Sequence, residues 1–362
     1  MGGLLFSLAI KLILRSLSSP LTVGFMDDVT LGGSKSTVST DVGLFRIERA
    51  KLGLNLNVSK CEIISRDQQP FEGPNEDFTR INPSDAVLLG APLGPGSALE
   101  SALEGRCSYL RIAIDYRKNI SAHDVFIFLR SSFSVSTLMY TLRCSPCTGH
   151  HFLEIDYGLL REGIPNSFLS DLQWLQVSPS IRAGGLGIRR TSSLALSAFL
   201  ASAASRSGFQ DRILSACMMG IDEKVRSARC SWSSSNGLPW PSNECAVHQC
   251  SWDAPGVARE WNTIWKGSLG ELDQARLIAL KAPHNSDWLF ALPPSNLPIT
   301  SCDLRLSDEA IRVAVVLRLG LNICEPHTCP CGADFCVRGT HGLSCKKGNG
   351  RSTRHHQVND LV

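Results

Sequence analysis

Four metal-binding side chains close to the C-terminal end constrain the fold more tightly than any other feature of this sequence. They follow the spacing Cys-x-Cys-x9-His-x3-Cys and are Cys329, Cys331, His341 and Cys345. Sulfur and imidazole ligands within so short a stretch can close a tetrahedral zinc site, which supplies most of the folding free energy of a small module. His341 and Cys345, four residues apart, would share one face of a helical turn. The spacing therefore predicts a zinc site, and the alternative is a set of buried free cysteines.

Spare ligands and a basic tail surround this cluster. Further metal-binding residue types nearby are Cys324, His327, Cys336 and His355. No Asp or Glu occurs between residues 336 and 359, where the basic side chains include Lys346, Lys347, Arg351 and Arg354. A small zinc module with such a stripe can contact nucleic-acid phosphates, an interaction that weakens steeply with salt. The alternative is a solvated tail.

A second group of candidate ligands lies near the N-terminal end. Residues 21–25 and 29–33 read as two strands joined by a tight turn, with Asp27 and Asp28 at the tip. Two adjacent carboxylates can bind a hard cation such as Mg²⁺, although two-metal nucleotidyl transfer needs at least one further carboxylate from another strand. Taken alone, an Asp-Asp pair is more typical of a solvated turn.

The pattern around this hairpin is that of a fold with both helices and strands. Apolar residues at helical spacing predict helices over 3–17 and 41–54, and residues 58–65 read as a short strand. The order helix, hairpin, helix, strand indicates an α+β fold. Residues 231–253 lack periodicity and read as a linker or long loop, whereas a helix is predicted to open at 307–309 and run to 319.

Several motifs occur in a fixed order along the chain. Residues 25–28 read aromatic-x-Asp-Asp, residues 52–62 run from Leu-Gly-Leu-Asn to Lys-Cys-Glu, and residues 88–94 contain Leu-Gly-Ala-Pro. Further on, residues 182–188 are Arg-Ala-Gly-Gly-Leu-Gly-Ile, and residues 339–345 complete the predicted zinc cluster. In this order they resemble non-LTR retrotransposon reverse transcriptases, with two palm motifs, the turn that supports the primer end, the segment after the thumb, and a Cys-Cys-His-Cys knuckle.

The resemblance implies a fold in four parts. We expect a partial right-hand polymerase palm over 1–96, a helical thumb over 97–205, a linker and helical connector over 206–300, and a helix with the zinc knuckle and basic tail over 301–362. The resemblance also implies RNA-directed DNA synthesis with two Mg²⁺ ions, an RNA template, a DNA primer and deoxynucleotides.

Individual residues take roles from the same resemblance. Asp27 and Asp28 would hold Mg²⁺, and Gly90 would lie at the primer end. Lys60 would donate a proton to the departing pyrophosphate or stabilise its charge, the alternative being a surface lysine that ends a strand. The first metal-binding Asp of the family lies on a strand that precedes the helix at 3–17, and this sequence shows no counterpart. We therefore expect this chain by itself to be inactive, and the competing function is a non-catalytic, zinc-dependent nucleic-acid-binding fragment.

Composition excludes some other classes of protein. With 43% hydrophobic residues a packed core is expected, and a net charge of +3 leaves nucleic-acid contact to local patches. The irregular spacing of most of the 14 cysteines favours reduced thiols in an intracellular protein of the nucleus or cytoplasm. Lys11 and Arg15 interrupt the apolar start, so we expect neither a secretory signal nor a membrane span. The oligomeric state is left open.

Two further motifs have competing interpretations. Ligand types at plausible spacing for a second metal site occur at Cys144, Cys147, His150 and His151, although Cys-x-x-Cys in a loop is more often incidental. The glycines of residues 184–187 lack the Lys-Ser or Lys-Thr pair of a phosphate-binding loop and read as a turn.

Overall fold

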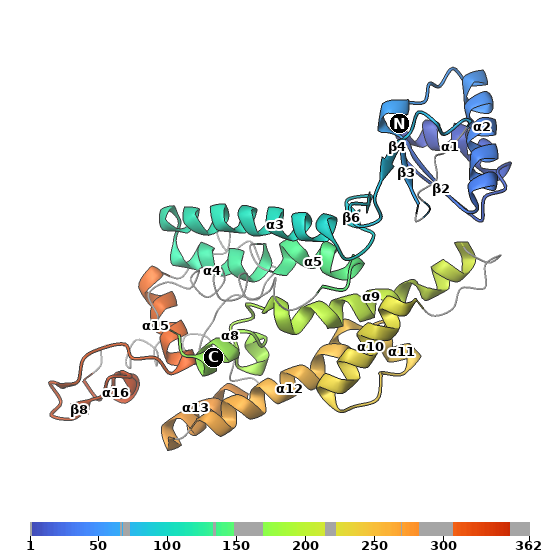
Figure 1. The fold of residues 1–362 in the computed structure, drawn as a ribbon. Coiled ribbons are helices and arrows are strands. Elements are labelled where there is room, and N and C mark those ends of the chain that lie inside the picture. The colour runs from blue at the N-terminus through green and yellow to red at the C-terminus, as the bar shows by residue number, and fades with distance from the viewer. Residues whose placement is uncertain are drawn as a thin grey trace, which may run out of the picture. The chain divides into compact units, whose positions relative to one another are not determined.

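The computed structural model describes residues 2–65, 67, 73–132, 135–147, 169–213, 222–268, 270–281 and 307–347. It confirms an α+β protein in which helices predominate, and the strands described form four separate two-stranded sheets. Figure 1 traces these elements along the chain. The chain forms two compact units. The first comprises residues 1–104, 140–147 and 195–252, and the second comprises residues 105–139, 148–194 and 253–362.

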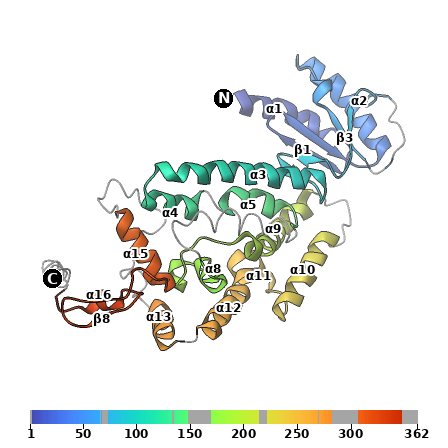
Figure 2. The same ribbon diagram turned by 60° about the vertical axis from the view of Figure 1, so that its left-hand side comes forward.

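The first unit opens with two helices and a hairpin. In chain order these are α1 (Gly2–Arg15), β1 (Leu21–Phe25), β2 (Asp28–Gly32) and α2 (Lys35–Lys51). The strands pair antiparallel, as predicted, with Phe25 opposite Asp28. Both helices lie beside the hairpin (Figure 2), and α1 and α2 share a small core of Ile10, Ile13 and Phe45. Apolar residues at helical spacing in the sequence thus form the face through which each helix packs against the other.

The next elements differ from the sequence prediction at their boundaries. The helix predicted from residue 41 begins at Lys35, because the side chain of Ser34 accepts the N–H of Thr37 and caps its first turn. The strand predicted over 58–65 is divided into a 3-10 turn, Val58–Lys60, and β3, Glu62–Ile64. β3 pairs in parallel with β4, which spans Thr79–Ile81.

A buried carboxylate joins the end of α1 to α2. Asp41 is 1% exposed and accepts the N–H groups of Ser18 and Ser19, together with the Ser19 hydroxyl. Burial alone would raise the pKa of Asp41, but these hydrogen bonds hold it below its ordinary value of 3.8. The ionised form of Asp41 therefore fixes the reversal of the chain between α1 and β1.

Replacing Asp41 with Asn should destabilise the protein by about 2 kcal/mol at neutral pH, because the amide loses charge-assisted hydrogen bonds. The pKa of Asp41 is lower in the folded state, so its contribution is present above about pH 3.8 and is lost as the pH falls through the folded pKa. Urea unfolding at several pH values measures the difference between native protein and variant, with the exposed Asp77→Asn as control. A difference that stays constant down to about pH 2 would contradict this role of the charge.

Helices form most of the remainder of the first unit, together with one short hairpin. The elements are β5 (Val87–Leu88), β6 (Ala91–Pro92), α3 (Ser97–Asp115), α5 (Val135–Cys144), α9 (Thr191–Ile213), α10 (Glu223–Asn236), α11 (Asn243–Ala246) and α12 (Gln249–Gly267). Of these, α3, α5, α9 and α12 have residues in both units.

The interpretation of residues 231–253 as a linker is wrong, since α10, α11 and α12 cover most of it. The rings of Trp232 and Trp252 are buried and meet edge to face with their centroids 5.1 Å apart. Both indole N–H groups donate to backbone carbonyls, at 3.0 Å and 2.8 Å. The serine-rich sequence shows no helical periodicity of apolar residues here, because the packing of these helices depends on a few tryptophans rather than on an apolar stripe.

The second unit contains the short elements that carry the predicted zinc ligands. Its elements are α4 (Ala122–Ser131), α8 (Asp171–Val177), a 3-10 turn (Ile181–Ala183), α13 (Glu271–Lys281), α15 (Asp308–Leu319), β7 (His327–Thr328), β8 (Asp334–Phe335) and α16 (Thr340–Ser344). α15 begins where the sequence predicts, because the side chain of Ser307 accepts the N–H of Ala310 at 3.2 Å. It packs against α4 and α8.

One stretch, residues 122–144, is long and apolar enough to cross a membrane by length and composition. This finding differs from the expectation, stated in the sequence analysis, that the chain contains no membrane span. Its described residues form α4 and α5, and 44% of its most apolar window is buried inside the structure. Core helices of soluble proteins pass the same test, so the stretch is weak evidence for a membrane span.

Candidate metal centre

Two turns position the four ligands predicted from the spacing. Cys329 and Cys331 lie between the antiparallel strands β7 and β8, in a turn that the N–H of Gly332 closes by donating to the Cys329 carbonyl at 2.8 Å. His341 lies in α16, and Cys345 follows that helix directly. α16 packs against β8, so the hairpin and the helix bring the four side chains together.

The ligand atoms lie close enough together for one metal ion to contact all four. Cys329 Sγ and Cys345 Sγ are 3.5 Å apart, and Cys331 Sγ is 3.1 Å from His341 Nε2. All four ligand atoms lie within 4.8 Å of one another. Around a tetrahedral zinc ion, with bonds of about 2.0 to 2.3 Å, ligand atoms stand about 3.5 to 3.8 Å apart. The quartet therefore fits a metal ion such as zinc.

The spare ligands named from the sequence do not join this quartet. Within the described residues it is the only group of three or more His, Cys, Asp or Glu side chains close enough to hold a metal. Cys324, His327 and Cys336 belong to the same zinc-fitting module, which comprises residues 320–347, but lie outside the group. His355 lies outside the described residues.

The cysteines differ in how readily they give up a proton. The N–H of Ala333 donates to Cys331, and contacts with Cys329 and other members of the quartet add to this effect, so the pKa of Cys331 is lowered to about 6. For Cys329, the N–H of Cys331 favours the thiolate, but burial and the neighbouring thiols raise its pKa. One thiolate is thus already present at neutral pH, ready for a cation.

Zinc affinity should depend on pH in two ranges. Zinc displaces the protons that remain on its cysteine ligands, and below about pH 6 it must also displace the proton of Cys331. A plot of log affinity against pH should therefore steepen by at least one unit below about pH 6. Competition with a chromophoric chelator on the full chain measures this dependence. Cys331→Ser should abolish tight binding and Cys324→Ser should not, and equal affinity in the two variants would contradict the assignment.

Phe335 and two glycines support the histidine ligand. The Phe335 ring stacks on His327 with centroids 4.5 Å apart and meets the His341 ring edge-on at 5.6 Å. A Cβ atom on Gly342 would lie 3.1 Å from this ring, and one on Gly339 would lie 2.7 Å from Ile323 Cγ2. Gly339 also has φ +66°, which favours glycine. Close packing therefore explains both glycines that flank the histidine.

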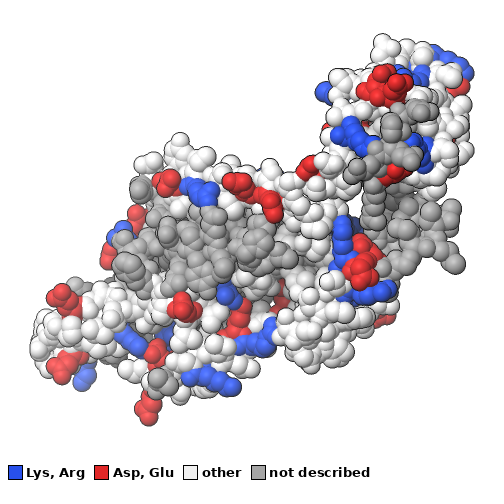
Figure 3. Space-filling view, in the orientation of Figure 1, with Lys and Arg blue, Asp and Glu red and all other residues white. Residues whose placement is uncertain are grey.

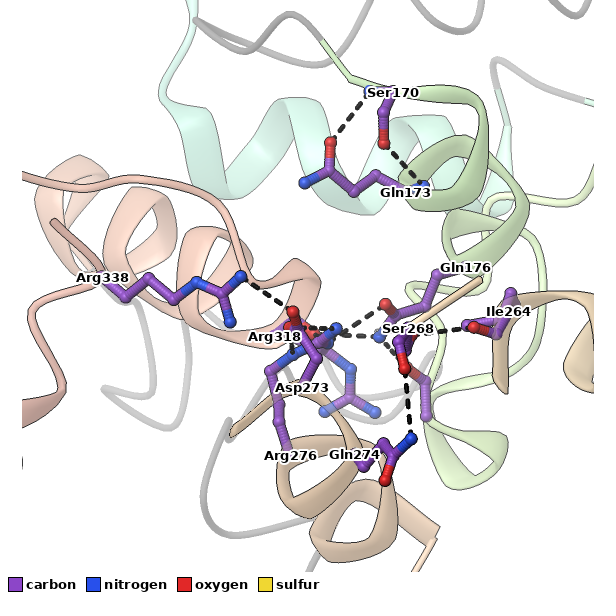
Figure 4. A network of polar contacts seen from close by, with 11 residues as sticks. Ser170, Gln173, Gln176, Ile264, Ser268, Asp273, Gln274, Arg276, Arg318 and Arg338 are labelled. Atoms are coloured by element: carbon purple, nitrogen blue, oxygen red, sulfur yellow. Dashed lines mark hydrogen bonds and ion pairs between the residues drawn. The ribbon is translucent and has the colours of Figure 1, made fainter. Parts of the chain in front are cut away.

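A carboxylate on α13 attaches this module to the helices of the second unit. Asp273 accepts a hydrogen bond from Arg338 at 2.8 Å and one from Arg276 at 3.4 Å (Figure 4). Burial alone would raise the pKa of Asp273, but the two guanidinium groups hold it below its ordinary value. Sequence reasoning missed this attachment, because no local pattern predicts a partner 65 residues away.

The same network continues into the interior of the second unit. Arg276 donates to the side chain of Gln176 at 3.1 Å and to the carbonyl of Arg318. Arg318 on α15 is fully buried, and its guanidinium donates to the carbonyls of Ile181 and Gly185. Ile181 lies in the 3-10 turn Ile181–Ala183, and Gly185 lies in the turn predicted from residues 184–187, where Gly184 has φ +84°. The motif thus serves as a turn that presents carbonyl groups to a buried cation.

The predicted magnesium ligands occupy the tip of the first hairpin. Asp27 and Asp28 are exposed, and Asp27 forms the two-residue turn together with Met26. No third ligand-type side chain joins them among the described residues. Lys60 is exposed at the end of its 3-10 turn, and Gly90 lies at the tip of the β5–β6 hairpin with φ +77°.

The basic tail is described only in part. Lys346 and Lys347 follow the last zinc ligand directly and are exposed. Lys347 Nζ donates to the carbonyl of Pro330 at 2.9 Å, so the start of the tail is held against the ligand turn. Arg351 and Arg354 lie outside the described residues.

The second metal site considered at Cys144 and Cys147 finds no support among the described residues. Burial raises the pKa of Cys147 to about 11, and neither cysteine belongs to a group of ligand-type side chains there. The remaining ligand types of this motif, His150 and His151, lie outside the described residues.

One thiol of the module stands outside the quartet and has an unusual environment. Cys336 is exposed, and its Sγ lies 3.2 Å from the Thr340 hydroxyl. That hydroxyl and the N–H groups of Thr340, Arg338 and Gly339 stabilise the thiolate and lower the pKa of Cys336 to about 7. A substantial fraction of this side chain is therefore in the thiolate form at neutral pH.

Comparisons of this chain with known protein families, with curated proteins and with solved structures found no match. Any functional assignment therefore rests on the residues and on the geometry described above.

Proposed function

We propose that this chain binds nucleic acid through its zinc-fitting module and acts in RNA-directed DNA synthesis of the non-LTR retrotransposon kind. The quartet itself supports the nucleic-acid-binding part of this proposal. Its four ligand atoms lie within 4.8 Å of one another, and two lysines directly follow its last member, Cys345. Lys346 and Lys347 are exposed, and the contact of Lys347 with Pro330 ties them to the ligand turn. Metal binding would therefore order the start of a basic segment.

The charge of the module supports contact with phosphate through the lysines rather than through the metal. A zinc ion with three thiolates and a neutral imidazole has a net charge of about −1, so it does not itself attract phosphate. The net charge of the chain is only +3, and basic side chains are interspersed with acidic ones on the face drawn in Figure 3. These features favour local, sequence-independent contacts with the phosphate backbone.

The salt dependence of binding tests this function. Changing Lys346 and Lys347 together to Ala in the full chain should reduce the slope of log affinity against log salt by about 0.7 to 0.9 for each phosphate that the lysines neutralise. Fluorescence anisotropy with labelled single-stranded RNA and duplex DNA, at several salt concentrations, measures the slope. Removing zinc with a chelator should weaken binding in the same assay.

A matched pair of lysines provides the control. Lys11 and Lys266 are exposed and lie outside the module, and changing both to Ala removes the same net charge. For this control variant, the slope of log affinity against log salt should equal that of the native protein. If both double variants flatten the slope equally, binding depends on total charge and not on the module.

A second candidate function is nucleotidyl transfer, which the β1–β2 hairpin favours. Met26 has φ +53°, which closes a two-residue turn and leaves both aspartates exposed at its tip. The hairpin is anchored closely on α1, because a Cβ atom on Gly24 would lie 2.7 Å from Leu14 Cδ1. Two adjacent carboxylates bind Mg²⁺ only weakly, so they offer part of a two-metal site and need a further carboxylate. In such a site the two carboxylates would hold the cation beside the reacting phosphate.

Primer extension on an RNA template tests this second function. A version of the chain lengthened upstream by the first aspartate strand of a non-LTR reverse transcriptase should extend a DNA primer in the presence of Mg²⁺. Asp27→Ala should reduce that extension by about two orders of magnitude or more, because a misplaced ion stabilises little of the transition state. Template-dependent extension by the chain of 362 residues alone would show that the carboxylates are wrongly assigned.

A further inference from the structure

Two cysteines outside the ligand quartet lie beside each other in the zinc-fitting module. Cys324 Sγ is 3.3 Å from the carbonyl oxygen of Cys336 and 3.7 Å from that of Val337. The N–H groups of Ile323 and Cys324 also donate to the Val337 carbonyl, at 2.8 Å and 3.2 Å. Two segments that are separated in the chain by the ligand turn are thus paired, and each carries one of the cysteines.

The pairing gives the two cysteines the arrangement of cross-strand neighbours. β7 and β8 run antiparallel, and in an antiparallel pair the contact from Ile323 to Val337 makes Cys324 and Cys336 the next opposite residues. The Cβ atoms of opposite residues are about 4.5 to 5.5 Å apart, and those of a disulfide are about 3.5 to 4.5 Å apart. A disulfide between the two therefore requires a shift of about 1 Å and rotation of the side chains.

The two thiols differ in exposure and in acidity. Cys336 is exposed, whereas Cys324 is half-buried. The Thr340 hydroxyl and nearby backbone N–H groups lower the pKa of Cys336 to about 7, which makes its sulfur a nucleophile at neutral pH. The thiol of Cys324 donates to the carbonyl oxygens of Cys336 and Val337, so its sulfur is directed toward the segment that carries Cys336. One sulfur is therefore accessible for attack on an electrophile, and the other lies beside it.

We propose that Cys336 and Cys324 form a peroxide-reactive pair, in which Cys336 is the attacking thiolate and Cys324 is the resolving thiol. The Cys336 sulfur attacks one oxygen of hydrogen peroxide, the O–O bond breaks, and the hydroxide that leaves takes up a proton and becomes water. The Cys324 sulfur then attacks the sulfenic acid, so that an S–S bond forms and the S–O bond breaks. The second hydroxide leaves as water with the proton of Cys324. Two thiols are thus oxidised to one disulfide while one peroxide is reduced to two waters.

The disulfide closes a loop that contains the first two candidate ligands. Cys324 and Cys336 are 12 residues apart in the chain, and Cys329 and Cys331 lie between them. Neither reacting cysteine belongs to the quartet, so the reaction consumes no candidate ligand. A cross-link of this kind restricts the unfolded chain, so it holds the two ends of the ligand turn together whether or not a metal ion is bound. This role does not depend on the proposed binding of nucleic acid.

Mass spectrometry of the full chain tests the pair. Reduced protein in the presence of zinc is treated with hydrogen peroxide at neutral pH, its remaining thiols are alkylated in denaturant, and it is digested with trypsin and an endoproteinase that cleaves before Asp. These enzymes separate residues 319–333, which contain Cys324, from residues 334–338, which contain Cys336. The two peptides should be recovered linked, with alkyl groups on Cys329 and Cys331, and dithiothreitol should separate them.

Serine substitutions distinguish the two roles. Cys324→Ser should lose the linked peptides and accumulate a sulfenic acid at Cys336, which dimedone traps. Cys336→Ser should lose both products, while its hydroxyl can still hydrogen-bond to Thr340. Cys230→Ser removes an exposed cysteine of α10, outside the module, and as the matched control it should leave the linked peptides unchanged.

The native protein alone decides whether the link forms, so the test does not depend on how well the variants fold. Peptides that remain unlinked in the native protein would overturn the proposal. A link that persists in Cys324→Ser would show that Cys336 pairs with a ligand cysteine, and it would overturn the proposal as well. Zinc binding by both serine variants, measured with a chromophoric chelator, would show that a lost link reflects the missing thiol and would support the pair.

Discussion

The guanidinium group of Arg318 is fully buried, and the packing of the second unit depends on satisfying its N–H groups. An arginine is always charged, and leaving its donors unpaired in a protein interior would cost several kcal/mol. The turn that follows α8 supplies carbonyl oxygens of Ile181 and Gly185. That turn needs glycine, because a Cβ atom on Gly185 would lie 2.1 Å from the carbonyl oxygen of Pro179. The turn that contains these glycines thus binds the guanidinium group of Arg318 through its carbonyl oxygens.

The metal centre is connected to this interior through a short series of polar contacts. Asp273 joins Arg338 of the zinc-fitting module to Arg276, and Arg276 reaches Gln176 and the carbonyl of Arg318. A carboxylate with two guanidinium partners stabilises both, since each alone would be a partly buried charge without a counterion. The small module therefore does not stand alone, and the free energy of binding a metal ion would be shared with the helices on which the module is anchored.

The features that sequence reasoning predicted are those that depend on residues close together in the chain. The β1–β2 hairpin follows from alternating apolar residues around a polar turn, and the quartet follows from ligand spacing within a single segment. The contacts that it missed join distant segments: Asp273 to Arg338, and Tyr140 to the carbonyl of Leu89. Neither pair has a local signature, because the residues are ordinary surface types until the fold brings them together. The helices over 231–253 were missed for a related reason, since buried tryptophans rather than periodicity stabilise them.

The thiol of Cys336 gives the zinc-fitting module a reactive group outside its four candidate ligands. Thiolates react with electrophiles and peroxides, and a pKa of about 7 gives this exposed side chain a substantial thiolate fraction at neutral pH. An adduct on its sulfur would break the contact with Thr340, the first residue of the helix that carries His341. Chemical modification of Cys336 would therefore act directly on the helix that presents one of the four candidate ligands.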